Sequence, residues 1–345
     1  MGHLSFPRGD AGSLSGPALF AALPAARRRI PWMSIGRFPT PVERVEELLP
    51  RGVELWVKRE DESGDLYGGN KVRKLEFLLG DARARNASEL VTFGGWGAHH
   101  VVATAIYGAR HGFGVTAALF PQPLDAHVQE QLLVDEAMGA QLIRVRSPLG
   151  VVPVWARAQL SPNTAWLAGG GSSPVGSLGW ASGGCELSAQ VRLGLLPPFD
   201  ALYVALGSGG TAAGLLWGVR APVRPVEIVA VRVVGAVAIG RRRVERLAQA
   251  VDELLAPVGG RALGGAPARL RIETRHAGRY GAPTPASLDA VAAAARVGLA
   301  LDPIYTGKVM AALLDDARAG RLDGKRILFL HSHNRVALAP LYRSS

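Results

Sequence analysis

The chain has 345 residues, of which 48% are hydrophobic and 19% charged, a composition typical of a folded globular protein rather than a disordered one. It contains no apolar run long enough to cross a membrane, no secretion signal near its start and a single cysteine, Cys185, which excludes an internal disulfide; we therefore expect a cytoplasmic protein without a membrane partner. The net charge of +11 comes almost wholly from arginine and is compatible with an anionic partner.

Residues 1–40 are rich in Pro, Gly and Arg, and we expect them to form an extended lead-in. From Val53 onward, strand-like and helix-like hydrophobic patterns alternate. The elements expected in this half are strand Val53–Lys58, helix Lys71–Arg85, strand Leu90–Phe93, helix His99–His111, strand Val115–Phe120, helix Ala126–Met138 and strand Gln141–Val145.

The segment Ala165–Gly184 is crowded with Gly and Ser, and we expect it to cross between domains. The elements expected after it are strand Ala201–Leu206, helix Thr211–Val219, strand Val226–Val233, helix Arg241–Leu255, helices Pro285–Val297 and Thr306–Ala319, and strand Arg326–His331. Strands that alternate with helices favour βαβ units and parallel sheets. The sequence therefore predicts the α/β class, with two open, twisted parallel-sheet domains and a cleft between them.

The densest group of arginines is Arg241–Arg243 with Arg246, on the expected helix Arg241–Leu255. No aromatic residues are interleaved with this group, and it belongs to no nucleic-acid-binding motif. We therefore expect no nucleic-acid partner. A solvated helix face and attraction of another anionic partner both stay open.

A glycine-rich turn precedes the first long helix and places a lysine at its start, in the order Gly68-Gly69-Asn70-Lys71. The positive end of the helix dipole and the nearby Arg73 and Lys74 disfavour an ammonium, so we expect a lowered pKa for Lys71. A free amine near neutral pH is the nucleophile that Schiff-base chemistry needs. The alternative is an ordinary solvated lysine at a helix start.

The loop Gly207–Thr211 directly follows the expected strand Ala201–Leu206 and directly precedes an apolar helix. Glycines let backbone amides converge on an anion, and Ser208 and Thr211 add hydroxyls. The loop lacks the Gly-Lys-Ser/Thr of a nucleotide-binding P-loop and is not a full dinucleotide fingerprint. It predicts a site for a single phosphate, with a glycine turn that binds nothing as the alternative.

A third segment places Tyr305 at the start of an expected helix, where its phenol could reach a cleft. Together with Lys58–Asp61 and Gly68–Glu76, these residues resemble the 1-aminocyclopropane-1-carboxylate deaminase / D-cysteine desulfhydrase family. That family belongs to the tryptophan-synthase-β-like, fold type II enzymes that use pyridoxal 5'-phosphate (PLP). The resemblance extends over about residues 39–340.

The resemblance implies PLP as the cofactor, bound in the cleft between the domains and held as a Schiff base on Lys71. It assigns to cofactor binding the residues Asn70, Lys71, Lys74, Gly207, Ser208, Gly209, Gly210, Thr211 and Ser332. It assigns to catalysis Lys71, Tyr280 and Tyr305. We expect a large domain of residues 1–74 and 166–345, a small domain of residues 75–165, and a homodimer.

Two segments depart from the family pattern. After Gly94-Gly95, the serine and asparagine that meet substrate and cofactor in the family are replaced by Ala98 and His99. Near the C-terminus, a family His-Thr-Gly-Gly reads His331-Ser332-His333-Asn334. We expect the substrate to meet Ala98, His99, His100 and His333. The new histidines can titrate near neutral pH, and they lack the carboxylate or cysteine spacing of a metal site, so we expect no metal.

The position after Tyr305 carries a glutamate in the deaminases and a threonine in the desulfhydrases, and here it is Thr306. A carboxylate would keep the cofactor's pyridine nitrogen protonated, whereas a hydroxyl such as that of Ser332 does so less. We therefore expect a PLP-dependent lyase that acts on a small amino acid by α,β-elimination, giving a 2-oxo acid and ammonia. The alternatives are a 1-aminocyclopropane-1-carboxylate deaminase-like enzyme, a β-replacement enzyme and a non-catalytic PLP-binding protein.

Overall fold

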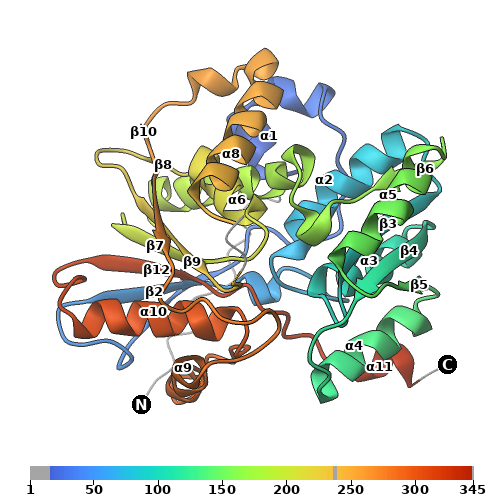
Figure 1. Ribbon diagram of the computed structural model, residues 1–345. Coiled ribbons are helices and arrows are strands. Elements are labelled where there is room, and N and C mark those ends of the chain that lie inside the picture. The colour runs from blue at the N-terminus through green and yellow to red at the C-terminus, as the bar shows by residue number, and fades with distance from the viewer. Residues whose placement is uncertain (1–15, 236–238, 344–345) are drawn as a thin grey trace.

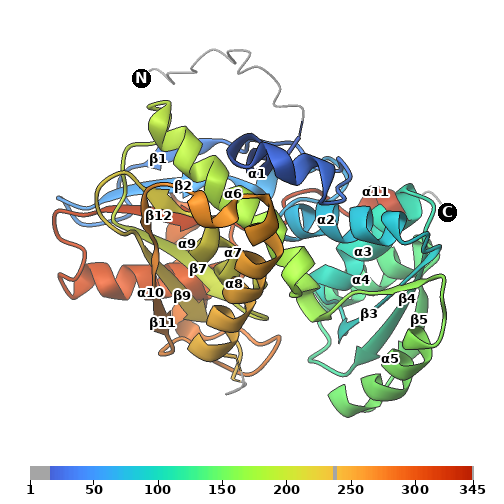
Figure 2. The ribbon, with the colours of Figure 1, turned by 90° about the horizontal axis from the view of Figure 1, so that it is seen from above.

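The computed structural model describes residues 16–235 and 239–343 of the chain. Two β-sheets lie side by side, each covered by helices, as Figure 1 and Figure 2 show from two directions. Within the described residues, no helix has both the length and the apolar character needed to cross a membrane.

The larger sheet has six strands, in the spatial order β1-β2-β12-β7-β9-β11. Their bounds are β1 Val42–Val45, β2 Glu54–Lys58, β12 Arg326–Leu330, β7 Ala201–Leu206, β9 Glu227–Arg232 and β11 Arg269–Glu273. All neighbouring pairs are parallel except β1 with β2. Successive residues of β7 are buried in different hydrophobic clusters on the two faces, which explains its uninterrupted apolar sequence.

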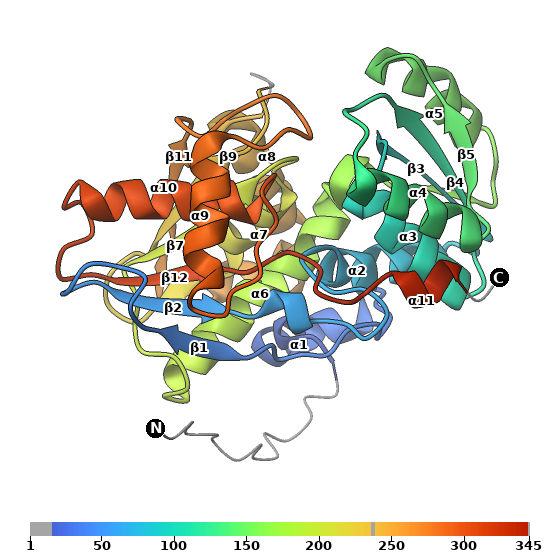
Figure 3. The same cartoon turned by 90° about the horizontal axis from the view of Figure 1, so that it is seen from below.

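Helices cover both faces of the larger sheet. One face packs against α9 (Pro285–Ala295) and α10 (Thr306–Arg318), and the other against α6 (Pro174–Arg192), α7 (Gly210–Gly218) and α8 (Arg241–Leu255). Figure 3 shows α9 and α10 on the side opposite α8. A short two-stranded sheet joins β8 (Arg220–Ala221) and β10 (Ala266–Pro267).

The smaller sheet has four parallel strands in the order β5-β4-β3-β6. Their bounds are β3 Glu89–Gly95, β4 Gly114–Phe120, β5 Gln141–Arg144 and β6 Thr164–Trp166. The associated helices are α2 Lys71–Ala84, α3 His99–Arg110, α4 Ala126–Ala137 and α5 Val151–Gln159. One face of this sheet packs against α2 and α3, where Leu75, Leu78 and Ile106 meet Leu90 and Val115.

Four segments that follow strands bring residues to the region between the sheets. In parallel sheets, ligands bind outside the carboxyl ends of strands. The loop after β3 leads into α3 at His99, and the loop after β7 leads into α7 at Gly210. The segments that follow β9 and β12 supply Val234 and Ser332. The topology therefore brings together the segments that the sequence singled out.

The sequence reading missed α6, because it treated Ala165–Gly184 only as a segment that crosses between domains. Residues 167–173 do connect the sheets, but a helix begins at Pro174. Its glycines allow close helix packing: a Cβ on Gly179 would lie 2.1 Å from the Arg73 carbonyl oxygen, and one on Gly184 would lie 2.5 Å from the Gly218 carbonyl carbon. Tertiary packing of α6 against α2 and α7 outweighs the poor helix propensity of glycine.

The expected extended lead-in is also wrong in part, because α1 (Ala18–Ala22) and a 3-10 turn (Pro24–Arg28) occur there and bury Leu19 and Phe20 against α6 and α8. Residues 1–15 lie outside the described part. The elements absent from the sequence prediction are α1, β1, α5, β6, α6, β8, β10, β11 and the C-terminal α11 (Ala339–Tyr342). The domain boundaries stay a prediction. The C-terminal α11, which that prediction places in the large domain, packs against α4 beside the smaller sheet.

We predict that Gly184→Ala lowers the free energy of unfolding by about 1–3 kcal/mol, because the added methyl group would force apart the backbones of α6 and α7. Urea unfolding measures the change. Gly264→Ala is the matched control, since a Cβ at Gly264 meets no atom within 4 Å. Equal stability of the two variants would contradict this account of the helix contact.

Candidate active site

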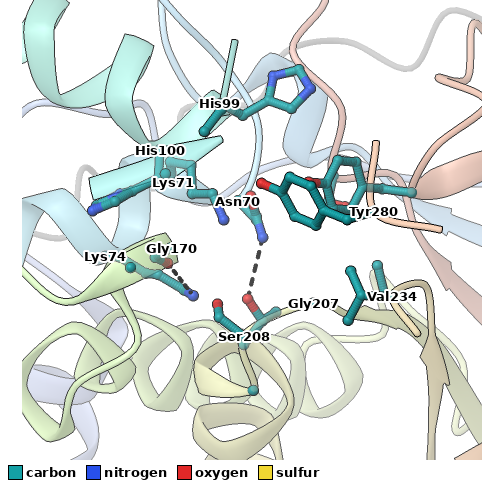
Figure 4. Close-up of a pocket in the computed structure, with 18 of the residues that line it drawn as sticks. Asn70, Lys71, Lys74, His99, His100, Gly170, Gly207, Ser208, Val234 and Tyr280 are labelled. Atoms are coloured by element: carbon teal, nitrogen blue, oxygen red, sulfur yellow. Dashed lines mark hydrogen bonds between the residues drawn. The ribbon is translucent and has the colours of Figure 1, made fainter. Parts of the chain in front are cut away.

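A cavity of about 640 Å³ lies between the two sheets, at the carboxyl ends of their strands. The predicted site residues in its wall are Asn70, Lys71, Lys74, Ala98, His99, His100, Gly207, Ser208, Gly209, Thr211, Tyr280, Tyr305, Ser332 and His333. Gly210 lies outside the wall, and its N–H donates to the Ser172 hydroxyl at 3.0 Å. Figure 4 shows the side chains of Lys71, Lys74, Ser208 and Tyr280 around one common space.

Lys71 is the first residue of α2, and the turn before it is tightly fitted. Gly69 has a φ of +88°, and a Cβ there would lie 2.6 Å from the Ser332 carbonyl oxygen, so only glycine suits the position. The Lys71 amine lines the cavity, and no hydrogen bond joins it to any described residue. Burial lowers the pKa of Lys71 to about 8. At pH 7.4 a pKa of about 8 leaves roughly a fifth of this amine neutral, far more than for an ordinary lysine.

The predicted direction of the Lys71 pKa shift is right, but the expected cause is wrong. We attributed it partly to Arg73, whose guanidinium points away from the cavity and donates to Glu60 and Glu186. Desolvation alone accounts for the shift of Lys71.

The loop between β7 and α7 carries several hydrogen-bond donors in one part of the cavity wall. Gly209 has a φ of +99°, and the N–H groups of Gly209 and Thr211 donate to no other group in the described part of the chain. The hydroxyls of Ser208 and Thr211 also lie in the cavity wall. Asn70 Nδ2 donates to Thr211 Oγ1 at 3.3 Å, which ties the loop to the turn before Lys71. This arrangement suits a bound oxyanion.

Lys74 adds a positive charge beside this loop. Its side chain is 1% exposed, and its ammonium donates to the Gly170 carbonyl oxygen at 2.9 Å and to the Ser172 hydroxyl at 3.2 Å. It pairs with no carboxylate of the described residues. Burial first, and then the Lys71 and Arg243 cations, hold the pKa of Lys74 well below its usual range. An amine buried here without an acidic partner would be a stable ammonium only beside a bound anion, which indicates an anion site.

The two tyrosines reach the cavity from segments next to the larger sheet, Tyr280 after β11 and Tyr305 at the start of α10. Asp302 holds Tyr305 in place, because its carboxylate accepts from the Tyr305 N–H at 2.6 Å and from the Thr306 N–H at 3.0 Å. The Tyr305 and Tyr280 hydroxyls interact, and burial raises the pKa of both, that of Tyr305 much more. Both phenols are therefore protonated at neutral pH, and Tyr280 is the stronger acid.

The remodelled loop after β3 places His99 in a hydrogen-bonded cluster. His99 Nδ1 lies 2.6 Å from the Tyr67 hydroxyl and 3.1 Å from Gln131 Nε2, which also lies 2.9 Å from His127 Nε2. An amide nitrogen can only donate, so Nδ1 accepts and the proton of a neutral His99 is on Nε2. The His333 ring lies 5.8 Å from the His99 ring, centroid to centroid.

The expectation that His99 titrates near neutral pH is wrong. Burial, reinforced by His333, lowers the pKa of His99 to about 3, and burial also lowers the pKa of His333. His99 therefore acts as a neutral hydrogen-bonding group. His100 is 2% exposed and neither of its ring nitrogens has a partner within the described residues. Ala98 packs against Val101 and Leu119 and offers no polar group.

Several wall residues escaped the sequence reading, chiefly Tyr67, Asp302 and Arg243. Tyr67 directly precedes the glycine turn and Asp302 lies in the quoted tyrosine segment, so proximity to known motifs could have pointed to both. Arg243 had no local signal beyond its arginine cluster. No three His, Cys, Asp or Glu side chains of the described residues are grouped so as to hold a metal ion.

These residues fit PLP. The cavity has an amine of lowered pKa for its aldehyde, and at one end a loop of free N–H groups with the buried amine of Lys74, which a bound phosphate would hold protonated. Lys71, Lys74 and the loop Gly207–Thr211 would hold the cofactor, and Ser332 offers a hydroxyl to the ring.

Comparison with known proteins supports the same assignment. The sequence pattern of pyridoxal-phosphate dependent enzymes matches residues 33–333. A D-cysteine desulfhydrase of Salmonella paratyphi A is 32% identical over 326 residues, covering 90% of this chain and 96% of that protein. A Pyrococcus abyssi protein provisionally named 1-aminocyclopropane-1-carboxylate deaminase is 32% identical over 320 residues, with 86% and 92% covered.

A solved structure described as an ACC deaminase homologue matches with a TM-score of 0.75 at 26% identity, and covers 94% of this chain and 99% of that one. The expected family and fold are thereby confirmed. The chain belongs to the 1-aminocyclopropane-1-carboxylate deaminase / D-cysteine desulfhydrase family of fold type II, pyridoxal-phosphate-dependent enzymes.

Proposed function

We propose that the protein is a lyase that eliminates the β-substituent of a small amino acid and yields a 2-oxo acid and ammonia. The observation that carries the proposal is the absence of a free carboxylate from the described cavity wall. Asp302 is the acidic residue there, and its oxygens already accept from the first turn of α10. Ser332 offers a hydroxyl instead, which supports elimination of a good leaving group over opening of a cyclopropane ring.

Lys71 and Tyr280 would divide the proton transfers. When bound, PLP supplies an electron-withdrawing ring that stabilises negative charge at the substrate Cα. Lys71 Nζ, released as a neutral amine, accepts the proton from Cα. Tyr280 Oη, protonated and the more acidic of the two phenols, donates a proton to the leaving group. Tyr305 supports this step by holding the Tyr280 hydroxyl.

We do not favour the alternatives. A 1-aminocyclopropane-1-carboxylate deaminase of this family has a glutamate where this chain has Thr306, whose hydroxyl donates to Asp302 at 2.6 Å. A non-catalytic PLP-binding protein would have no use for Tyr280 and Tyr305 beside Lys71. A β-replacement enzyme needs room for a second substrate, and the products formed distinguish it from a lyase.

We also propose that the protein is a cytoplasmic homodimer. Light scattering of the purified protein tests the oligomeric state.

We predict that the PLP-loaded protein forms a 2-oxo acid and ammonia from at least one β-substituted amino acid. A panel of D- and L-amino acids, with 1-aminocyclopropane-1-carboxylate included, is followed by cofactor absorbance and by 2-oxo acid release. Release from the cyclopropane substrate alone would identify a deaminase instead. No absorbance change with any amino acid would identify a binding protein without catalysis.

We predict that His99→Ala raises KM or lowers kcat on the best substrate by about tenfold or more, on the order of 1.4 kcal/mol, because a fixed neutral donor in the cavity is lost. His127→Ala is the matched control, since His127 shares the Gln131 amide but is exposed and outside the cavity wall. Steady-state kinetics separates KM from kcat. Equal activity of both variants and the wild type would remove His99 from substrate binding.

A further inference from the structure

One arginine of the cluster on α8, Arg243, reaches the cavity wall. Its Nε donates to the Ser208 carbonyl oxygen at 2.9 Å. Arg241 of the same helix pairs with Glu245 at 3.0 Å, whereas Arg243 forms no ion pair with any described residue. The sequence left open whether this cluster attracts an anion. A cation fixed beside the candidate phosphate loop without an acidic partner makes Arg243 the member of the cluster to consider.

The bond from Arg243 fixes the peptide between Ser208 and Gly209. In a planar trans peptide the carbonyl and the following N–H point in opposite directions, so anchoring the Ser208 oxygen also sets the direction of the Gly209 N–H. Gly209 has a φ of +99°, a conformation that favours glycine, and its N–H donates to no described group. Arg243 therefore orients a donor that an anion in the loop would use.

Charge balance gives Arg243 a second role. A phosphate monoester carries about −1.5 to −2 charges near neutral pH. Lys74, once protonated beside a bound phosphate, would supply one positive charge at the loop, and Asn70 and Thr211 are neutral. Arg243 acts on Lys74 electrostatically: burial, Lys71 and Arg243 together lower the pKa of Lys74 while no anion lies between Arg243 and Lys74. A phosphate held by both would be neutralised more fully than by Lys74 alone.

We propose that Arg243 positions the phosphate loop and supplies the second positive charge for the phosphate group of PLP. The other arginines of the cluster have no such role. Arg242 is exposed and outside the cavity wall, and Arg241 is paired with Glu245. The proposal concerns cofactor binding alone, so it does not depend on which reaction the loaded enzyme catalyses.

The test measures the affinity of the cofactor-free protein for PLP and for pyridoxal, which lacks the phosphate, by absorbance titration without substrate. Wild type, Arg243→Gln and Arg242→Gln are compared. Both substitutions remove one positive charge from an exposed arginine in the first turn of the same helix, so they are matched in net charge and in expected stability, which melting temperatures check. Arg243→Gln should weaken PLP binding by about tenfold or more and leave pyridoxal binding unchanged. Arg242→Gln should change neither.

Two results would overturn the proposal. One is equal PLP affinity of the Arg243→Gln and Arg242→Gln proteins. The other is a parallel loss of PLP and pyridoxal binding in Arg243→Gln, which would mean that Arg243 maintains the shape of the cavity and not the phosphate site. Failure of the proposed elimination would appear separately, as a PLP-loaded wild type that releases no 2-oxo acid.

Discussion

The position of Lys71 depends on a buried ion network two residues further along α2. The Arg73 guanidinium donates to the Glu60 carboxylate at 2.7 and 2.8 Å and to the Glu186 carboxylate at 2.9 and 3.0 Å, and Lys58 completes the network at Glu186. Burial opposes ionisation of Glu186, but the Arg73 and Lys58 cations outweigh it and lower its pKa to about 2. Two cations therefore balance two carboxylates inside the protein.

This network joins the start of α2 to β2 and α6, and so fixes the direction in which the Lys71 side chain enters the cavity. Removing one partner of such a buried pair costs about 3–5 kcal/mol, because an uncompensated charge is left behind. The same α2 carries the core residues Leu75 and Leu78 of the smaller half. One helix thus couples the stability of the interior to the placement of the reactive amine and of Lys74.

Desolvation gives the cavity its chemistry. It lowers the pKa of the Lys71 amine to about 8, keeps the Tyr280 and Tyr305 phenols protonated and makes His99 a neutral ring. The phosphate end instead holds Lys74 and Arg243, which have no acidic partners among the described residues. A bound phosphate would keep both of these groups protonated, so that end of the cavity is suited to anchor a cofactor with a phosphate tail.

The sequence predicted what local pattern determines. Short apolar runs between helical patterns predicted most strands of both sheets, and the motifs around Lys71, Gly207–Thr211 and Tyr305 led to one cavity. The sequence did not predict features that depend on tertiary contacts. The glycines of α6 are favourable only because α2 and α7 pack against them, and Tyr67 meets His99 only in the folded chain. The pKa expected for His99 was wrong for the same reason, because the burial of a side chain depends on the fold.

The central claim is that Lys71 holds the cofactor, and the lysines themselves suggest the most direct test. The chain has five lysines, and the ammonium groups of the other four donate hydrogen bonds to protein oxygens, so Lys71 alone is free to react. Borohydride reduction of the PLP-loaded protein, followed by peptide mapping, fixes the cofactor to the lysine that holds it. The account predicts a pyridoxyl group on Lys71 alone. A label on Lys74 or Lys308 would contradict it.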